Sequence, residues 1–141
     1  MLRAPAGRRV VAAVPVRRSG SGAVEFLVVR TSAGDRWTLP KGGCERGETP
    51  PEAAAREAME EAGVAGSIGA EPLAEYHYGG DVVTAFLLVA EYLIAPQEPA
   101  RDPTWCGLEA ARAKLAEGRP EGFGAQMERV LREAERAVTG R

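Results

Sequence analysis

The chain has 141 residues, 45% of them hydrophobic and 27% charged, and a net charge of −2, which suits one globular domain (residues 1–141) and not a general nucleic-acid-binding protein. No apolar run approaches the roughly 20 residues of a membrane span, and the N-terminal arginines precede no signal-peptide core. Two cysteines, Cys44 and Cys106, are too few for a disulfide framework, so we predict a cytoplasmic protein.

The first third of the chain is predicted to form strands. Segments 8–16 and 24–30 are rich in valine and flank a Ser/Gly turn at 18–22, which favours a hairpin. Residues 37–40 form a short extended piece. Residues 1–41 hold eight Lys or Arg against two acids, and residues 42–64 hold two against six. A basic region beside an acidic one suits a polyphosphate held by cations and by metal ions.

A glycine-rich loop at 42–48 leads into a predicted helix over 50–62. Thr49 and Glu52 have the spacing of a capping box, and Pro50 suits the first helical position. Gly63 is the expected stop.

This helix places Glu57, Glu60 and Glu61 within roughly 100° of one another, so their carboxylates share a face. Crowded like charges destabilise a helix by roughly 0.2–0.5 kcal/mol per pair, and a hard cation such as Mg²⁺ would neutralise them, with Mn²⁺ as an alternative. Arg56 lies one turn from both Glu52 and Glu60 and can pair with either. The plainer interpretation of such a helix, taken alone, is a solvated acidic face.

The rest of the chain alternates strands and helices. We expect one or two strands between 64 and 78, a turn at 79–81, and a buried central strand over 82–93, where periodicity alone does not exclude a helix. A loop at 96–103 precedes a short helix at 108–115, and an amphipathic helix begins at Gln126. The order predicts an α/β fold in which a mixed β-sheet lies between helical layers.

The segment 42–64 resembles the full signature of the Nudix hydrolases, G-x5-E-x7-R-E-u-x-E-E-x-G-u, where u is aliphatic. The matching residues are Gly42, Glu48, Arg56, Glu57, Ala58, Glu60, Glu61, Gly63 and Val64. The resemblance implies the Nudix fold, an α/β/α sandwich. Arg8-Arg9, Asp35-Arg36-Trp37 and the Trp105 segment are similar to the branch that hydrolyses diadenosine and diphosphoinositol polyphosphates.

The resemblance also implies a chemistry, in which water attacks one phosphorus of a pyrophosphate bond with metal assistance. It implies metal on Glu57, Glu61 and a backbone carbonyl near Lys41, with Arg56 in the catalytic set. Glu60 is the candidate base, although in other branches the base sits on a later loop and Glu60 binds metal. Glu48 is expected to tie the loop to the helix.

The expected substrate is a small polyphosphate, preferably a dinucleoside polyphosphate, with diphosphoinositol polyphosphates or nucleoside triphosphates as rivals. A non-catalytic nucleotide-binding module is the alternative from another class. The protein would be a monomer or homodimer. Candidate substrate-binding residues are Arg9, Arg36, Trp37, Lys41, Gly42 and Gly43. Weaker candidates are Arg30 and His77 for phosphates, Tyr78 for a base, and Asp102 and Glu121 as late-loop bases.

Overall fold

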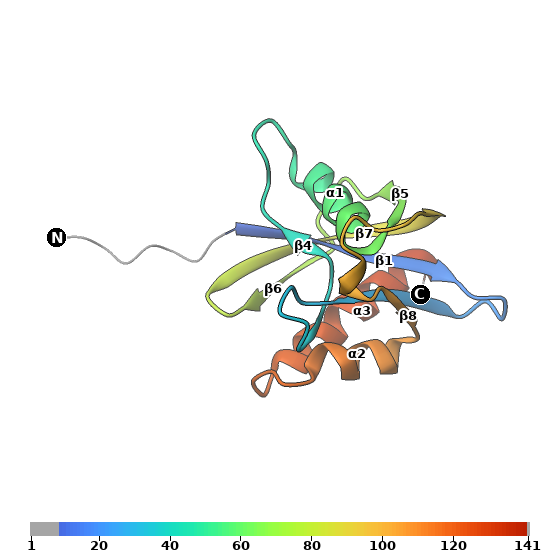
Figure 1. Ribbon diagram of the computed structural model, residues 1–141. Helices are drawn as coiled ribbons and strands as arrows, with labels where there is room; N and C mark the ends of the chain where they lie inside the picture. Colours follow the sequence, from blue (N-terminus) through green and yellow to red (C-terminus); the bar gives the residue numbers. More distant parts are fainter. Residues whose placement is uncertain (1–8, 141) are drawn as a thin grey trace.

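The structure is a computed structural model that describes residues 9–140. A mixed sheet separates α1 from α2 and α3 (Figure 1). Its strands are β1 (Arg9–Arg18), β2 (Val24–Arg30), β3 (Trp37–Thr38), β4 (Lys41–Gly42), β5 (Val64–Ile68), β6 (Ala74–Tyr78), β7 (Asp81–Leu93) and β8 (Thr104–Cys106). The helices are α1 (Pro50–Ala62), α2 (Leu108–Ala116) and α3 (Phe123–Thr139), with a short 3₁₀ helix, η1 (Pro99–Arg101).

Strand β1 is the axis of the sheet. It runs parallel to β7 from the pair Arg9↔Val82 to the pair Val16↔Val89, and antiparallel to β2 and β4. The main path of the sheet is β3-β2-β1-β7-β5, while β4, β6 and β8 pair with β1, β7 and β2. The predicted mixed sheet is therefore confirmed.

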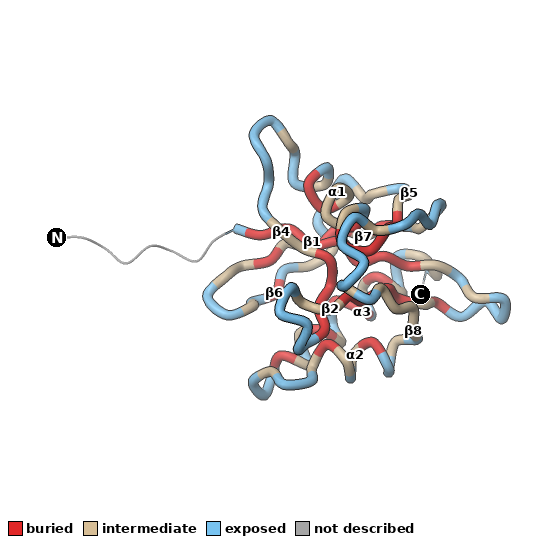
Figure 2. The backbone as a smooth tube through the Cα atoms, in the orientation of Figure 1, coloured by how far each residue is buried: buried red, intermediate tan, exposed pale blue. Residues whose placement is uncertain are grey.

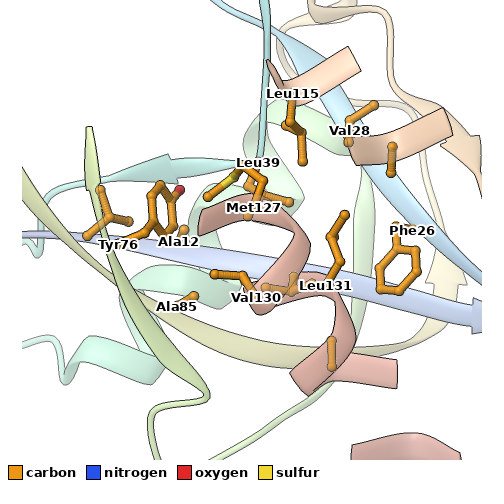
Figure 3. Close-up of a cluster of buried hydrophobic side chains, with 14 of the residues drawn as sticks. Ala12, Phe26, Val28, Leu39, Tyr76, Ala85, Leu115, Met127, Val130 and Leu131 are labelled. Carbon is orange, nitrogen blue, oxygen red and sulfur yellow. The ribbon is translucent and has the colours of Figure 1, made fainter. Parts of the chain in front are cut away.

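The two faces of the sheet bury separate hydrophobic layers, because successive residues of β1 point to opposite sides. Val11 and Ala13 pack with the buried alanines of α1. Val10, Ala12 and Val14 pack with α2 and α3, where the close-up labels Leu115, Met127, Val130 and Leu131 (Figure 3). The predicted α/β/α arrangement is confirmed, and the buried stretches follow the central strands (Figure 2).

Most of the predicted elements are present, but two expectations change. Strands β4 and β8 were not predicted, since each has two or three residues. The prediction that 82–93 is buried throughout is wrong for its end, where Tyr92 and Leu93 are 65% and 59% exposed. The residues of β7 that pack in the two cores lie between Val83 and Ala90, before this exposed end. None of the helices in the part of the chain that the structure describes is long and apolar enough to cross a membrane.

Candidate active site

Capping interactions fix both ends of α1. The Thr49 hydroxyl accepts a hydrogen bond from the Glu52 backbone N–H at 3.3 Å, and Glu52 Oε1 accepts one from the Thr49 N–H at 2.9 Å. At the other end Gly63 adopts a left-handed conformation (φ 64°) and its N–H donates to the Met59 carbonyl. The carboxylates of α1 are therefore presented from a helix with defined ends.

Arg56 ties the loop at 43–48, which projects at the top of Figure 1, to α1. Its Nε donates to Glu48 Oε2 at 2.7 Å, its Nη1 to Glu60 Oε2 at 3.1 Å, and its Nη2 to the Gly43 carbonyl at 3.0 Å. Glu48 also accepts from the Glu45 N–H at 2.8 Å. The hydrogen bond from Arg56 lowers the pKa of Glu48, so this carboxylate stays charged and holds the loop.

Glu61 is buried and Glu57 is half-buried, with side chains 5% and 13% exposed. Burial raises the pKa of Glu61 to about 8, against the attraction of Arg101, and burial also raises the pKa of Glu57. The two carboxyl groups share a hydrogen bond. Glu61 Oε1 is buried without a hydrogen-bond partner, 3.5 Å from Arg101 Nη1. Such a pair of carboxyl groups holds a proton where a cation could sit.

Glu60 is set apart from this pair, because its carboxylate turns to Arg56. Within residues 9–140, no three His, Cys, Asp or Glu side chains are grouped as a ready-made metal site. Mg²⁺ nevertheless fits, because it is commonly held by one or two carboxylates, waters and substrate phosphates. Arg56 Nη1 also lies 3.5 Å from Glu57 Oε2, so the acidic face predicted from the helix has Glu60 and Glu57 beside Arg56, while Glu61 lies beside Arg101.

Gly42 lies directly against the Glu57 carboxylate. It lies on β4, opposite Val11 of β1, and a Cβ built on it would lie 1.7 Å from Glu57 Oε2. A Cβ on Gly43 would meet nothing within 4 Å. Only glycine at position 42 leaves room for the carboxylate in this position.

A polar cavity of about 160 Å³ adjoins Glu61. Its lining consists of Thr31, Ser32, Thr38, Lys41, Glu61, Tyr78 and Arg101. Arg101, on η1, donates to the Arg30 carbonyl at 3.1 Å and to Glu98 Oε1 at 3.1 Å. Sequence reasoning missed Arg101, because no local pattern in the loop after β7 indicates that it reaches α1.

The other predicted binding residues have varied surroundings. Arg9 is exposed and pairs with Glu75 at 3.3 Å. Trp37 is 6% exposed, and the Arg30 guanidinium and Lys114 ammonium lie 4.0 and 4.5 Å from its ring centroid, so this arrangement leaves no open face for a base.

Arg36, His77, Tyr78 and Glu121 line a second cavity of about 720 Å³. Asp102 ends η1 in a left-handed conformation, and its carbonyl accepts a hydrogen bond from the Thr104 hydroxyl. Of the two late-loop acids, Glu121 lines this second cavity.

Comparisons with known proteins agree with this geometry. The NUDIX domain family model matches residues 7–125. "Nudix hydrolase 21, chloroplastic" of Arabidopsis thaliana is 36% identical in an alignment 115 residues long, which covers 74% of this chain and 58% of the relative. "Nudix hydrolase 18, mitochondrial" of the same plant is 34% identical in an alignment 119 residues long, which covers 74% of this chain and 67% of the relative. The chain thus spans about three fifths to two thirds of the length of these relatives.

Solved structures show the same fold. A binary complex of a C. elegans Ap4A hydrolase has a TM-score of 0.68 and 25% identity, over 95% of this chain and 99% of that chain. The NUDIX domain of Shewanella oneidensis NrtR, complexed with ADP ribose, has a TM-score of 0.67 and 20% identity, over 92% and 88%.

Proposed function

This chain belongs to the Nudix hydrolase family, and on that premise we propose that it is a pyrophosphohydrolase that uses a divalent metal ion, Mg²⁺ or Mn²⁺. The observation that carries the proposal is the half-buried Glu57 next to the buried Glu61, which lines a cavity with the cations Lys41 and Arg101. Carboxylates that would hold a cation, next to side chains that would hold phosphates, are what cleavage of a phosphoric anhydride requires.

Each residue of the candidate active site would have a separate role. A bound dication would neutralise phosphate charge and acidify a water molecule. Glu57 and Glu61 would hold it, with the backbone at Lys41 as a further ligand. Arg56 positions Glu60, the candidate acceptor of the water's proton. The positive charges of Lys41 and Arg101 would balance the negative charge of the phosphoryl groups.

Dinucleoside polyphosphates are the preferred substrates, and the likeness to a C. elegans Ap4A hydrolase at 25% identity supports this choice. Diphosphoinositol polyphosphates and nucleoside triphosphates remain rivals. The cytoplasmic location, the single domain and a monomeric or homodimeric state remain predictions. A non-catalytic nucleotide binder is disfavoured by this carboxylate pair, since binding a nucleotide alone does not need two desolvated acids.

Glu57→Gln and Glu60→Gln test the proposal on a panel of these substrates with Mg²⁺ or Mn²⁺, with the released products separated and quantified. Glu57→Gln removes a charged metal ligand, and Glu60→Gln removes the candidate base. We expect each to lower kcat by roughly 100-fold or more. Glu128→Gln is the matched control, because Glu128 lies on α3 in an ion pair with Arg132. Full activity in both variants, or nucleotide binding without hydrolysis across the panel, would refute the enzyme described here.

A further inference from the structure

The cavity of about 720 Å³ lies beside the cavity at Glu61, because Tyr78 lines both. Its walls come from the ends of β6 and α3 and from the segments before β3 and between α2 and α3. The residues that decide its chemistry are Arg36, His77, Tyr78, Arg119, Phe123 and Gln126. A substrate bound at Glu57 and Glu61 would extend naturally into this space.

The aromatic side chains of this cavity are already engaged. Lys41 Nζ lies 4.1 Å and the Arg119 guanidinium 4.4 Å from the centroid of the Tyr78 ring. The ring of Phe123 meets Tyr78 edge-on, with centroids 5.8 Å apart and planes at 75°, and Arg119 lies 5.5 Å from its centroid. Stacking of a base needs a free aromatic face, so the cavity is not a base slot.

Arg119 has an incomplete set of hydrogen bonds. Its Nη2 donates to the Trp37 carbonyl at 3.2 Å, which anchors the side chain, but its Nε is buried without a partner. A buried charged donor without an acceptor is costly, and an incoming anion would supply one.

Contacts between neighbouring residues fix the walls of the cavity around Arg119. The Arg36 side chain lies against Gly118, the residue before Arg119, with its Nε 3.3 Å from the position of an added Cβ. The Gln126 amide accepts from the His77 N–H at 2.9 Å and donates to the His77 carbonyl at 3.2 Å, which fixes the opposite wall. Two guanidinium groups therefore share this cavity with one carboxylate, that of Glu121.

We propose that this cavity is an anion subsite, in which Arg119 and Arg36 hold a phosphate-bearing part of the substrate beyond the bond that is cleaved. The subsite makes the enzyme select for the number of phosphates and not for the identity of a base. This inference rests on the proposed function for its place in the reaction, but not for the binding itself.

Binding without metal tests the subsite directly. Inorganic tripolyphosphate is titrated calorimetrically into wild-type protein in the presence of EDTA, and then into Arg119→Ala, Arg36→Ala and the control Arg132→Ala. Arg132 lies on the outer side of α3 and pairs with Glu128. We expect the Kd to rise roughly tenfold or more in the first two variants and to stay within twofold in the control. Wild-type affinity in Arg119→Ala and Arg36→Ala, or displacement of tripolyphosphate by adenosine, would overturn the proposal.

Kinetics then place the subsite in the reaction. For diadenosine tri-, tetra- and pentaphosphate we expect kcat/KM to rise with phosphate number in the wild type and to be nearly flat in Arg119→Ala. Arg119→Lys, which keeps the charge, should recover part of the slope. Arg36→Ala decides the question if loss of the bond to Trp37 unfolds Arg119→Ala, since Arg36 is exposed. If none of these compounds is hydrolysed, dinucleoside polyphosphates fail as the preferred substrates, and failure across the whole substrate panel refutes the proposed function, while the titrations without metal still decide the subsite.

Discussion

At the scale of single residues, the site depends on the lack of a side chain at Gly42. Glu57 occupies the volume that a Cβ at position 42 would need. The clashing atom belongs to the end of a flexible side chain and not to the backbone, so a methyl group there would move the carboxylate more than the fold. Metal ligands tolerate little displacement, because the geometry of Mg²⁺ is close to octahedral.

Gly42→Ala is therefore expected to leave the free energy of unfolding within about 1 kcal/mol of the wild-type value and to weaken Mn²⁺ binding roughly tenfold or more. Gly43→Ala is the matched control, since its Cβ would enter open space. The measurement is Mn²⁺ titration followed by electron paramagnetic resonance, with urea unfolding of the same samples. Equal Mn²⁺ affinity in the two variants would show that Glu57 does not hold the ion.

At the scale of elements, local sequence patterns predict α1 and its caps but not the residues from distant segments that surround α1 and line the cavities. The capping box of Thr49 and Glu52, the proline at the start of α1 and the stop at Gly63 are all present, because caps depend on residues within one turn of each other. The link between Glu48 and Arg56 follows from the same segment. These features could be predicted from the sequence because the contacting residues are close along the chain.

The walls depend on pairings between distant segments, which no local pattern specifies. Arg101 reaches Glu61 across 40 positions, and Arg119 bonds Trp37 across 82. Strand β8 forms only because β2 offers an edge to Thr104–Cys106. Trp37 illustrates the same limit, since the sequence cannot show that Arg30 and Lys114 cover its ring.

Gly63 joins α1 to the segment that carries Arg101. Its φ is +64°, and an added Cβ would lie 2.1 Å from the Ile94 carbonyl oxygen. Ile94 in turn donates its N–H to the Gly63 carbonyl at 2.7 Å. A side chain at this position therefore meets backbone that is already hydrogen-bonded.

Gly63→Ala should destabilise the protein by more than about 2 kcal/mol, from left-handed strain of roughly 1–2 kcal/mol plus the backbone clash. Gly79→Ala is the matched control, because Gly79 has φ +61° but open space around its Cβ, so it carries the strain alone. Urea unfolding of both variants isolates the cost of the clash. Equal losses of stability in the two variants would mean that the backbone at Ile94 can move away from Gly63 at no cost.

At the scale of the whole molecule, the fold holds an acidic side chain largely out of bulk water. The sheet and α1 enclose Glu61, and η1 adds Arg101 beside it. Without metal, the folded protein keeps a proton on Glu61, whose pKa is raised to about 8 mainly by burial. If Glu61 holds the ion as proposed, stability and metal binding are coupled through the same carboxyl group.

The sign of this coupling gives a prediction about pH. The folded pKa of Glu61 lies above the ordinary value of 4.5, so between pH 4.5 and 8 the folded state binds a proton that the unfolded state releases. The metal-free protein should lose stability as pH rises through this window, by about 1.4 kcal/mol for each unit by which the pKa is raised. The lowered pKa values of Glu48 and Glu52 act below this window, where their stabilisation is lost on acidification.

Urea unfolding in EDTA at several pH values measures this slope, and the same series in Mg²⁺ should reverse it, because metal binds the ionised carboxylates of the folded state only. Glu61→Gln cannot ionise, so its stability in EDTA should be flatter with pH and should respond less to Mg²⁺. Some slope should remain in Glu61→Gln, because burial also raises the pKa of Glu57. A wild-type protein whose metal-free stability rises from pH 5 to pH 8, or whose full slope survives in Glu61→Gln, would show that Glu61 is ionised without metal. Other groups of the protein would then stabilise the ionised Glu61 carboxylate, and the proposal that a cation binds there would lose its support.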